Sequence, residues 1–265
     1  MTKLAFDDIT RRALMVGIAA PVALAQTPSA QLKSTVLKMA AKPEPFEFDP
    51  ATSAVIVVDM QNDFGTKGGM FERAGIDISM IQKAVPPTAK VLSKARQKGV
   101  RIVYLKMAFQ PDLSDMGSAD CTNRVRHMRL GVGKEVSTPD GRPSRILIRD
   151  TWNTDIVAEL KPQPEDVVMY KPRFSGFYQT DLDATLKKMG IKHLIFTGCT
   201  TSICVESTIR DAMFRDYLCV LLADCAGEPI GNDFARSNHE ASLLSIQTLL
   251  GWVSSSDELM KTFGA

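Results

Sequence analysis

The stretch His193–Met213, HLIFTGCTTSICVESTIRDAM, decides the fold because it joins a buried strand to an amphipathic helix. Its first five residues form a largely apolar run that ends at Gly198, which is the pattern of a central strand in a parallel sheet. From Val205 onward, apolar residues recur at the spacing of one helix face. Thr201 or Ser202 is expected to cap this helix at its N-terminus. The stretch therefore predicts a strand that turns directly into a helix.

Cys204 lies in the first turn of that predicted helix, just past the carboxyl end of the strand. Unpaired N–H groups and the positive end of the helix dipole favour a thiolate at such a position. Ligand sites in open α/β sheets also gather at the carboxyl ends of strands. Cys204 is therefore a candidate nucleophile, and the alternative interpretation is a small buried core residue.

Strand-like and helix-like segments alternate along the rest of the chain. This alternation predicts an α/β fold, a three-layer sandwich in which a mostly parallel central sheet carries helices on both faces. The expected strands are Ser53–Asp59, Val100–Met107, Asp166–Tyr170, His193–Thr197 and Leu218–Ala223. The expected helices are Ile81–Lys98, Asn153–Leu160, Thr180–Met189, the helix from Val205, and Asp233–Leu250. No internal repeat is present.

A long segment without clear periodicity, Ala108–Ser144, interrupts this alternation. It is rich in Gly, Asp, Asn and Arg. Loops of this length in compact enzymes usually cover a site, so we expect it to border one. The alternative is a disordered insertion.

The N-terminal region differs in composition from the rest. Met1–Ala25 has a basic start with the pair Arg11–Arg12, then a mildly apolar segment that ends in Ala-Leu-Ala before Gln26. This order predicts a Tat-type export signal and a periplasmic protein, and the alternative is an N-terminal helix of a cytoplasmic one. The apolar segment is too short for a permanent membrane anchor. Residues 26–50 contain four prolines and are expected to form a linker or wrapping arm, and residues 51–265 the folded domain.

The overall composition excludes several classes of function. The formal net charge is +2, and no long block of Lys or Arg occurs, so a nucleic-acid partner is not expected. The five cysteines are too scattered for a disulfide framework, and no pair has zinc-knuckle spacing. The three histidines are far apart and match no zinc signature, so no metal site is expected.

Three polar residues occupy equivalent places at strand ends. Asp59 ends one predicted strand, Lys171 follows another, and Cys204 follows a third. The carboxyl ends of parallel strands share one edge of a sheet, so these side chains can converge. An ammonium nearby lowers a thiol pKa, and a carboxylate can accept the thiol proton and later activate water. The trio predicts a hydrolytic cysteine site, while a structural Asp59–Lys171 ion pair is the alternative.

The runs VVDMQNDF, KPRFSGF and TGCTTSICVESTIRDA resemble those of the isochorismatase-like cysteine hydrolases, and the similarity extends from about Ala54 to Ser255. The resemblance implies that residues 51–265 form a hydrolase domain of that fold with Asp59, Lys171 and Cys204 as the catalytic triad. It also implies a cis peptide bond between Cys199 and Thr200, with the N–H groups of Thr200 and Cys204 as the oxyanion hole.

Within that family, the segments WNTDIV, KPRFSGFYQTDLDATL and CVESTIRDAMFRDY look most like ureidoacrylate amidohydrolases. The loop after Asp59 lacks the histidines that bind the metal in metal-containing nicotinamidases. True isochorismatases, which hydrolyse a vinyl ether, lack the nucleophilic cysteine, so Cys204 argues against that reaction. We therefore expect a cysteine amidohydrolase without metal or organic cofactor that acts on a small ureido or amide substrate. Biuret, N-carbamoyl amino acids and aromatic amides are alternative substrates. Relatives are commonly homodimers or homotetramers, and the expected pocket walls are Phe64, Asn123 and Phe174.

Two interpretations from other classes remain open. One is a non-catalytic domain of the same fold that binds a ligand or a partner. The other is a redox-active thiol pair formed by Cys199 and Cys204.

Overall fold

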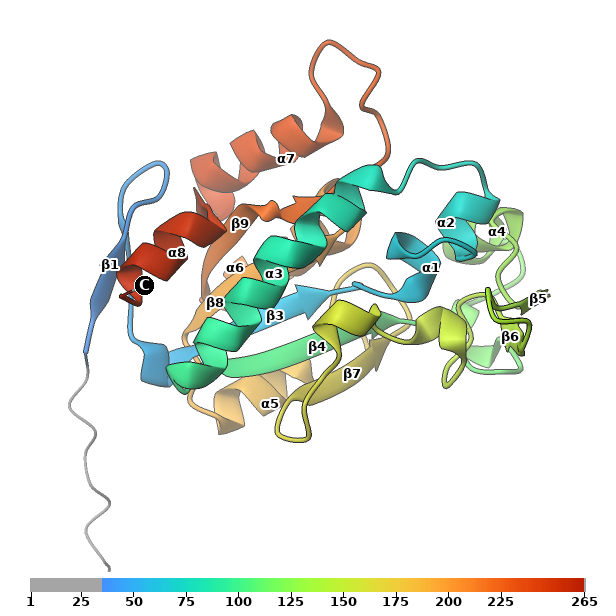
Figure 1. Ribbon diagram of the computed structural model, residues 1–265, viewed down its shortest axis with the longest axis horizontal. Coiled ribbons are helices and arrows are strands. Elements are labelled where there is room, and N and C mark those ends of the chain that lie inside the picture. The colour runs from blue at the N-terminus through green and yellow to red at the C-terminus, as the bar shows by residue number, and fades with distance from the viewer. Residues whose placement is uncertain (1–34, 265) are drawn as a thin grey trace, which may run out of the picture. The chain divides into compact units, whose positions relative to one another are not determined.

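The computed structural model describes residues 35–264, and its centre is a six-stranded sheet in which every neighbouring pair is parallel (Figure 1). The strand order is β10-β9-β8-β3-β4-β7. The strands are β3 (Ser53–Val58), β4 (Arg101–Met107), β7 (Val167–Lys171), β8 (His193–Cys199), β9 (Leu218–Gly227) and β10 (Trp252–Ser254). This confirms the predicted α/β class and the five predicted strands, and it adds β10 at one edge.

Helices cover both faces of the sheet because the central strands are apolar on both sides. Along β3, Val55 and Val57 pack in one core cluster, whereas Ala54, Ile56 and Val58 pack in the other. The first cluster includes the long α3 (Ser79–Gln97) and α8 (Ser256–Thr262). The second includes α5 (Leu182–Lys188), α6 (Glu206–Met213) and the end of the α7 segment (Asn238–Ser245, continued by a π-helical turn to Leu250). The result is the predicted three-layer sandwich.

The end of the predicted arm belongs to the folded core. Within residues 35–50, β1 (Leu37–Met39) and β2 (Phe46–Phe48) form an antiparallel hairpin. The Phe46 ring lies 5.1 Å from the Trp252 ring, and the Phe48 ring lies 5.8 Å from that of Phe263. The hairpin thus covers the β10 edge with buried aromatic surface. The predicted export signal, Met1–Ala25, lies outside the described residues.

The long segment Ala108–Ser144 has more regular structure than its sequence indicated. It contains α4 (Thr122–Arg129) and the strand β5 (Glu135–Ser137), which pairs with β6 (Pro143–Arg145). The short helices α1 (Asn62–Gly65) and α2 (Met70–Arg73) precede α3. Apolar residues spaced along the segment, including Met116 and Val132, are buried in the core, so the segment is a packed cover.

Two predicted helices are wrong in their extent. Asn153–Leu160 forms two single 3₁₀ turns, because Ile156 between them bridges to Gln61 in an extended conformation. The helix predicted from Asp233 begins at Asn238, where Ser237 and Glu240 form a capping box. Within residues 35–264, no helix combines the length and the apolar character that crossing a membrane requires.

Candidate active site

The residues Asp59, Lys171 and Cys204 meet at the carboxyl edge of the sheet, as the sequence predicted. Asp59 directly follows β3, Lys171 is the last residue of β7, and Cys204 lies in the turn between β8 and α6. Strand β4 separates β3 from β7, so Asp59 reaches across the end of β4 to its partner. All three side chains are buried, with exposed fractions of 1%, 0% and 7%.

Asp59 and Lys171 form a buried ion pair with 2.7 Å between Oδ2 and Nζ. The end of β4 supports both partners, because the Met107 N–H donates to Asp59 Oδ1 (2.8 Å) and the Met107 sulfur lies 3.7 Å from Lys171 Nζ. Lys171 also donates to the backbone carbonyl of Arg173 (3.2 Å). A buried pair is tolerable only when further hydrogen bonds satisfy its remaining polar atoms, and these contacts provide them.

The Cys204 thiol is coupled electrostatically to both the Asp59 carboxylate and the Lys171 ammonium group, since each of the three groups shifts the pKa of the other two. A carboxylate, an ammonium group and a thiol therefore lie together at this edge of the sheet. Burial raises the pKa of Cys204 well above its usual value, and the Lys171 charge offsets only part of that effect. The expectation of a thiolate favoured by the helix terminus is thus wrong, because desolvation outweighs the local positive charges.

The electrostatics of the ion pair suit a proton acceptor. Burial raises the pKa of Asp59, while Lys171 and hydrogen bonds from Cys204 and Met107 pull it down. Burial alone would lower the pKa of Lys171, but the attraction of Asp59 and Cys204 raises it above its usual value. Lys171 therefore stays a cation beside a carboxylate whose basicity is enhanced. This arrangement can move a proton from the thiol to Asp59 when a substrate arrives.

Cys204 is presented by a π-helical turn, Thr201–Val205, which leads into α6. The peptide bond between Cys199 and Thr200 is cis, which confirms the expectation from the family resemblance. Neither Thr201 nor Ser202 caps the helix through its side chain, so that prediction is wrong. Thr200 Oγ1 is buried and has no hydrogen-bond partner among the described residues. The oxyanion role of the Thr200 and Cys204 N–H groups stays a prediction.

The sequence did not indicate that Gln61 and Cys199 support the position of Asp59. Gln61 is fully buried, and its amide bonds to the Met107 backbone at both ends, accepting from N–H (2.7 Å) and donating to C=O (2.9 Å). The Cys199 thiol donates to the Asp59 carbonyl (3.2 Å). Gln61 belongs to the run VVDMQNDF, and its position two residues after Asp59 in that run could have indicated its supporting role.

The three predicted pocket residues lie in different surroundings. Phe64 is buried in the apolar core, with its ring 4.9 Å from that of Phe71. Phe174 is 40% exposed and packs against His127 on α4, with 5.7 Å between the ring centres. Asn123, also on α4, donates to the Met116 carbonyl (3.0 Å), while its buried Oδ1 has no partner within residues 35–264. Asn123 and Phe174 thus flank the same histidine beside the Lys171 strand end, and their contact with substrate stays a prediction.

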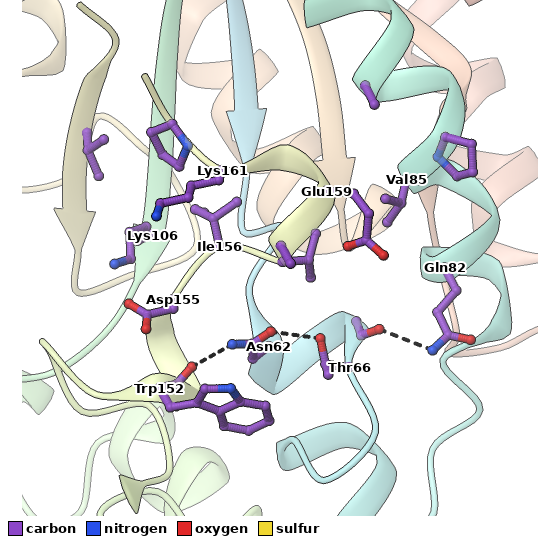
Figure 2. Close-up of a pocket in the computed structure, with 17 residues that line it drawn as sticks. Asn62, Thr66, Gln82, Val85, Lys106, Trp152, Asp155, Ile156, Glu159 and Lys161 are labelled. Carbon is purple, nitrogen blue, oxygen red and sulfur yellow. Dashed lines mark hydrogen bonds between the residues drawn. The ribbon is translucent and has the colours of Figure 1, made fainter. Parts of the chain in front are cut away.

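A groove of about 1180 Å³ lies elsewhere, between α3 and the segment around residues 152–162. Figure 2 shows Lys106 and Lys161 on one side of it, with Glu159 and Gln82 toward the other. No cysteine or histidine lines this groove, and neither Asp59 nor Lys171 does. The trio of Asp59, Lys171 and Cys204 therefore lies outside this groove. Across the part of the chain that the structure describes, no cluster of His, Cys, Asp or Glu has the arrangement of a metal site.

Comparisons with known proteins agree with this geometry. The model of the isochorismatase domain family matches residues 53–258. A ureidoacrylate amidohydrolase RutB of Serratia proteamaculans is 37% identical over 92% of this chain and 95% of its own length. The RutB of Caulobacter segnis is 36% identical over 90% of this chain and 97% of its own. A cysteine hydrolase structure from Pseudomonas syringae superposes with a TM-score of 0.68 at 28% identity, covering 88% and 98% of the two chains.

Proposed function

The chain belongs to the isochorismatase family, and from that premise we propose that it hydrolyses a carbon–nitrogen bond of a small ureido acid with Cys204 as the nucleophile. The observation that carries the proposal is that Cys204 lies buried beside the Asp59–Lys171 ion pair at the carboxyl edge of the sheet. Hydrolysis of non-peptide C–N bonds is the chemistry of its amidohydrolase relatives.

The geometry supports a two-step mechanism. Asp59 removes the proton of the Cys204 thiol, and the sulfur adds to the carbonyl carbon of the substrate. The oxyanion accepts hydrogen bonds from the N–H groups near Thr200. Asp59 then returns the proton to the departing nitrogen as one C–N bond breaks, which leaves the carbamoyl group on Cys204 as a thioester-like thiocarbamate.

Water completes the cycle. Asp59 takes a proton from a water molecule, and the hydroxide adds to the carbonyl carbon bound to sulfur. As the C–S bond breaks, Asp59 returns that proton to the sulfur, which regenerates the thiol, and the released carbamate decomposes to ammonia and carbon dioxide. Lys171 stays charged throughout and stabilises the negative charge that alternates between Asp59 and the sulfur. The proton transfers in both steps use only Asp59 and Cys204, which lie beside the Lys171 charge in the buried site.

The choice of a ureido substrate is supported by the relatives. Several proteins named ureidoacrylate amidohydrolase are 36–39% identical over most of this chain. The unpartnered buried oxygens of Thr200 and Asn123 also suit a substrate rich in N–H donors, because a buried acceptor without a partner is costly.

An ammonia-release screen tests the proposal. Purified protein is incubated with ureidoacrylate, N-carbamoyl amino acids, biuret and an aromatic amide, and the values of kcat/KM are compared. We expect ureido acids to be preferred over the aromatic amide by at least roughly 10²-fold. Preference for biuret or for the aromatic amide would select that alternative class. Absence of turnover on every compound, together with tight binding of one, would favour the non-catalytic binding domain.

Export and assembly are proposed from the sequence and the family. We propose that Met1–Ala25 directs Tat-type export and is removed, so that the mature protein starts at Gln26 in the periplasm. Mass spectrometry of the mature N-terminus tests this, and an intact Met1 in exported protein would contradict it. We also propose a homodimer or homotetramer, which light scattering tests.

A further inference from the structure

The turn that presents Cys204 lacks an N-terminal cap of its own. No side chain adjacent in sequence bonds to its first N–H groups, and α6 likewise has no side-chain cap. The first N–H groups of a helix have no partner within the helix and need one from elsewhere. The position of the nucleophile therefore depends on a partner supplied by another part of the chain.

That partner is Glu228, the residue after β9. Its Oε2 accepts hydrogen bonds from both the N–H (2.8 Å) and the O–H (2.6 Å) of Ser202, which stands two residues before Cys204. The β8–β9 register explains the meeting, because Cys199 pairs with Gly227 and the chain leaves both strands at the same level. Glu228 thus replaces the missing cap from a neighbouring strand.

Glu228 is itself held rigidly. Its side chain is fully buried, its Oε1 accepts from the Ile230 N–H (3.1 Å), and its backbone carbonyl accepts from the Asn232 amide (2.7 Å). It forms no ion pair with any residue that the structure describes. Burying a carboxylate without a cation is costly, so this acid needs its hydrogen bonds to the turn.

The segment after Glu228 adds a second contact to the same turn. The loop leads to α7 (Figure 1), where His239 Nδ1 lies 2.9 Å from the Thr201 hydroxyl. The Cys204 turn is therefore held at Thr201 by α7 and at Ser202 by Glu228. Of the two, Glu228 makes the stronger connection, because a carboxylate oxygen there accepts two hydrogen bonds.

We propose that Glu228 is a positioning residue for catalysis, which fixes the Cys204 sulfur against the Asp59–Lys171 pair by holding Ser202. This inference rests on the proposed function, since it assigns how the nucleophile of that site is aimed. Displacement of a reacting atom by about 1 Å costs roughly 10²-fold in rate. A positioning role therefore predicts a loss in kcat with little change in KM.

The same strand offers a matched control. Asp224 on β9 accepts from the N–H (2.8 Å) and the O–H of Ser256, the first residue of α8. This pair repeats the carboxylate–serine contact at a helix that carries no residue of the site, but here Asp224 is exposed and α8 also has a side-chain cap of its own, Ser255. Asp224→Ala therefore measures the cost of losing a carboxylate–serine contact on β9 without touching the nucleophile.

The experiment compares kcat, KM and Tm of full-length variants on the preferred ureido acid, with the iodoacetamide reactivity of Cys204 as a second readout. Glu228→Ala should lower kcat about 10²-fold with KM nearly unchanged, whereas Glu228→Gln, which keeps an acceptor for Ser202, should stay within about 5-fold of wild type. Ser202→Ala, at a partly exposed residue, should lower kcat about 5-fold, and it decides the question if Glu228→Ala does not fold. Asp224→Ala should leave kcat within about 2-fold.

Equal losses in Glu228→Ala and Glu228→Gln, an unchanged kcat in Ser202→Ala, or an equal loss of kcat in Asp224→Ala would each overturn the proposal. If wild-type protein hydrolyses none of the compounds, the proposed function fails first. The alkylation rate of Cys204 then still tests the positioning role. The alkylation rate of Cys204 should differ between wild type and Glu228→Ala but not between wild type and Asp224→Ala. An unchanged alkylation rate in Glu228→Ala would overturn the inference.

Discussion

Asp59 and Asp63 are two buried aspartates, one directly after β3 and one in the short helix α1 that follows, and their surroundings differ in one decisive way. Asp59 faces a cation and a thiol, Lys171 and Cys204. Asp63 faces N–H donors of the Met70 and Leu147 backbone (2.9 and 2.7 Å) and the Asn153 amide. The surroundings of Asp59 are reactive because they contain side chains that can exchange protons. The surroundings of Asp63 contain only fixed amide donors, so Asp63 anchors α2 and the segment before residue 153.

The comparison teaches that burial alone does not identify a catalytic carboxylate. Burial raises the pKa of both aspartates, that of Asp63 to about 6. Only Asp59 has a partner from which it can take a proton and a cation that stays charged while it does so. The following predictions test this distinction, from the largest expected effect to the smallest.

Asp59→Asn should lower kcat roughly 10³-fold, because an amide cannot accept the thiol proton. The same change at Asp63 should lower kcat less than about 10-fold, since it alters only an anchor. Ammonia-release kinetics of both variants, with circular dichroism as the control for folding, measure the contrast. Comparable losses of kcat in two folded variants would abolish the distinction between the regions.

Lys171→Met should lower kcat about 10²-fold and displace the acidic limb of the pH–rate profile to higher pH. The Lys171 charge holds the pKa of Asp59 below the value that burial alone would impose. Without that charge, Asp59 stays protonated to higher pH, and protonated Asp59 cannot act as a base. An acidic limb that stays in place would show that Asp59 is not the group that titrates in the rate profile.

Asp63→Asn should change how stability depends on pH. Because burial raises the pKa of Asp63 from 3.8 to about 6, the native state binds this proton more tightly than the unfolded chain between those values. The protonated Asp63 contributes up to about 3 kcal/mol to the free energy of unfolding below about pH 4, and this contribution is lost as the pH rises through about 6. Urea unfolding of wild type and Asp63→Asn at several pH values measures how the free energy of unfolding changes with pH. That change should be smaller in the variant. Identical changes in the two proteins would show that Asp63 does not titrate in this range.

Cys199→Ser should have the smallest effect, with kcat within about 3-fold of wild type. The serine hydroxyl can still donate to the Asp59 carbonyl, which is the contact that Cys199 makes. Cys199 and Cys204 are both free thiols in the structure. Loss of activity that follows oxidation in wild type but not in this variant would instead support the redox-active thiol pair.

The fold and the convergence of Asp59, Lys171 and Cys204 were predictable from the sequence because both depend on patterns that are local. Apolar runs located the central strands, and the polar residues that follow them, Asp59, Lys171 and Cys204, had to share one edge of a parallel sheet. The cis bond before Thr200 came from the family resemblance and not from any spacing of residues.

Features that depend on tertiary contacts were missed. The segment around Ile156 has a helical composition, but its pairing with Gln61 holds it extended. The thiol pKa of Cys204 was assigned the wrong direction, because the depth of burial is not written in the local sequence. The role of Glu228 was missed because the strand was predicted to end at Ala223, five residues earlier. In the structure β9 continues to Gly227 through an irregular register, and this places the Glu228 carboxylate beside the turn that carries Cys204.

The most direct test of the central claim is mass spectrometry of the protein quenched with acid during turnover of its ureido substrate. The account predicts a substrate-derived acyl group on the peptide that contains Cys204. This group should form when substrate is added and disappear when substrate is exhausted. Cys204→Ala should carry no such group and should not hydrolyse the substrate. An acyl group on another residue, or full turnover by Cys204→Ala, would contradict the assignment of Cys204 as the nucleophile.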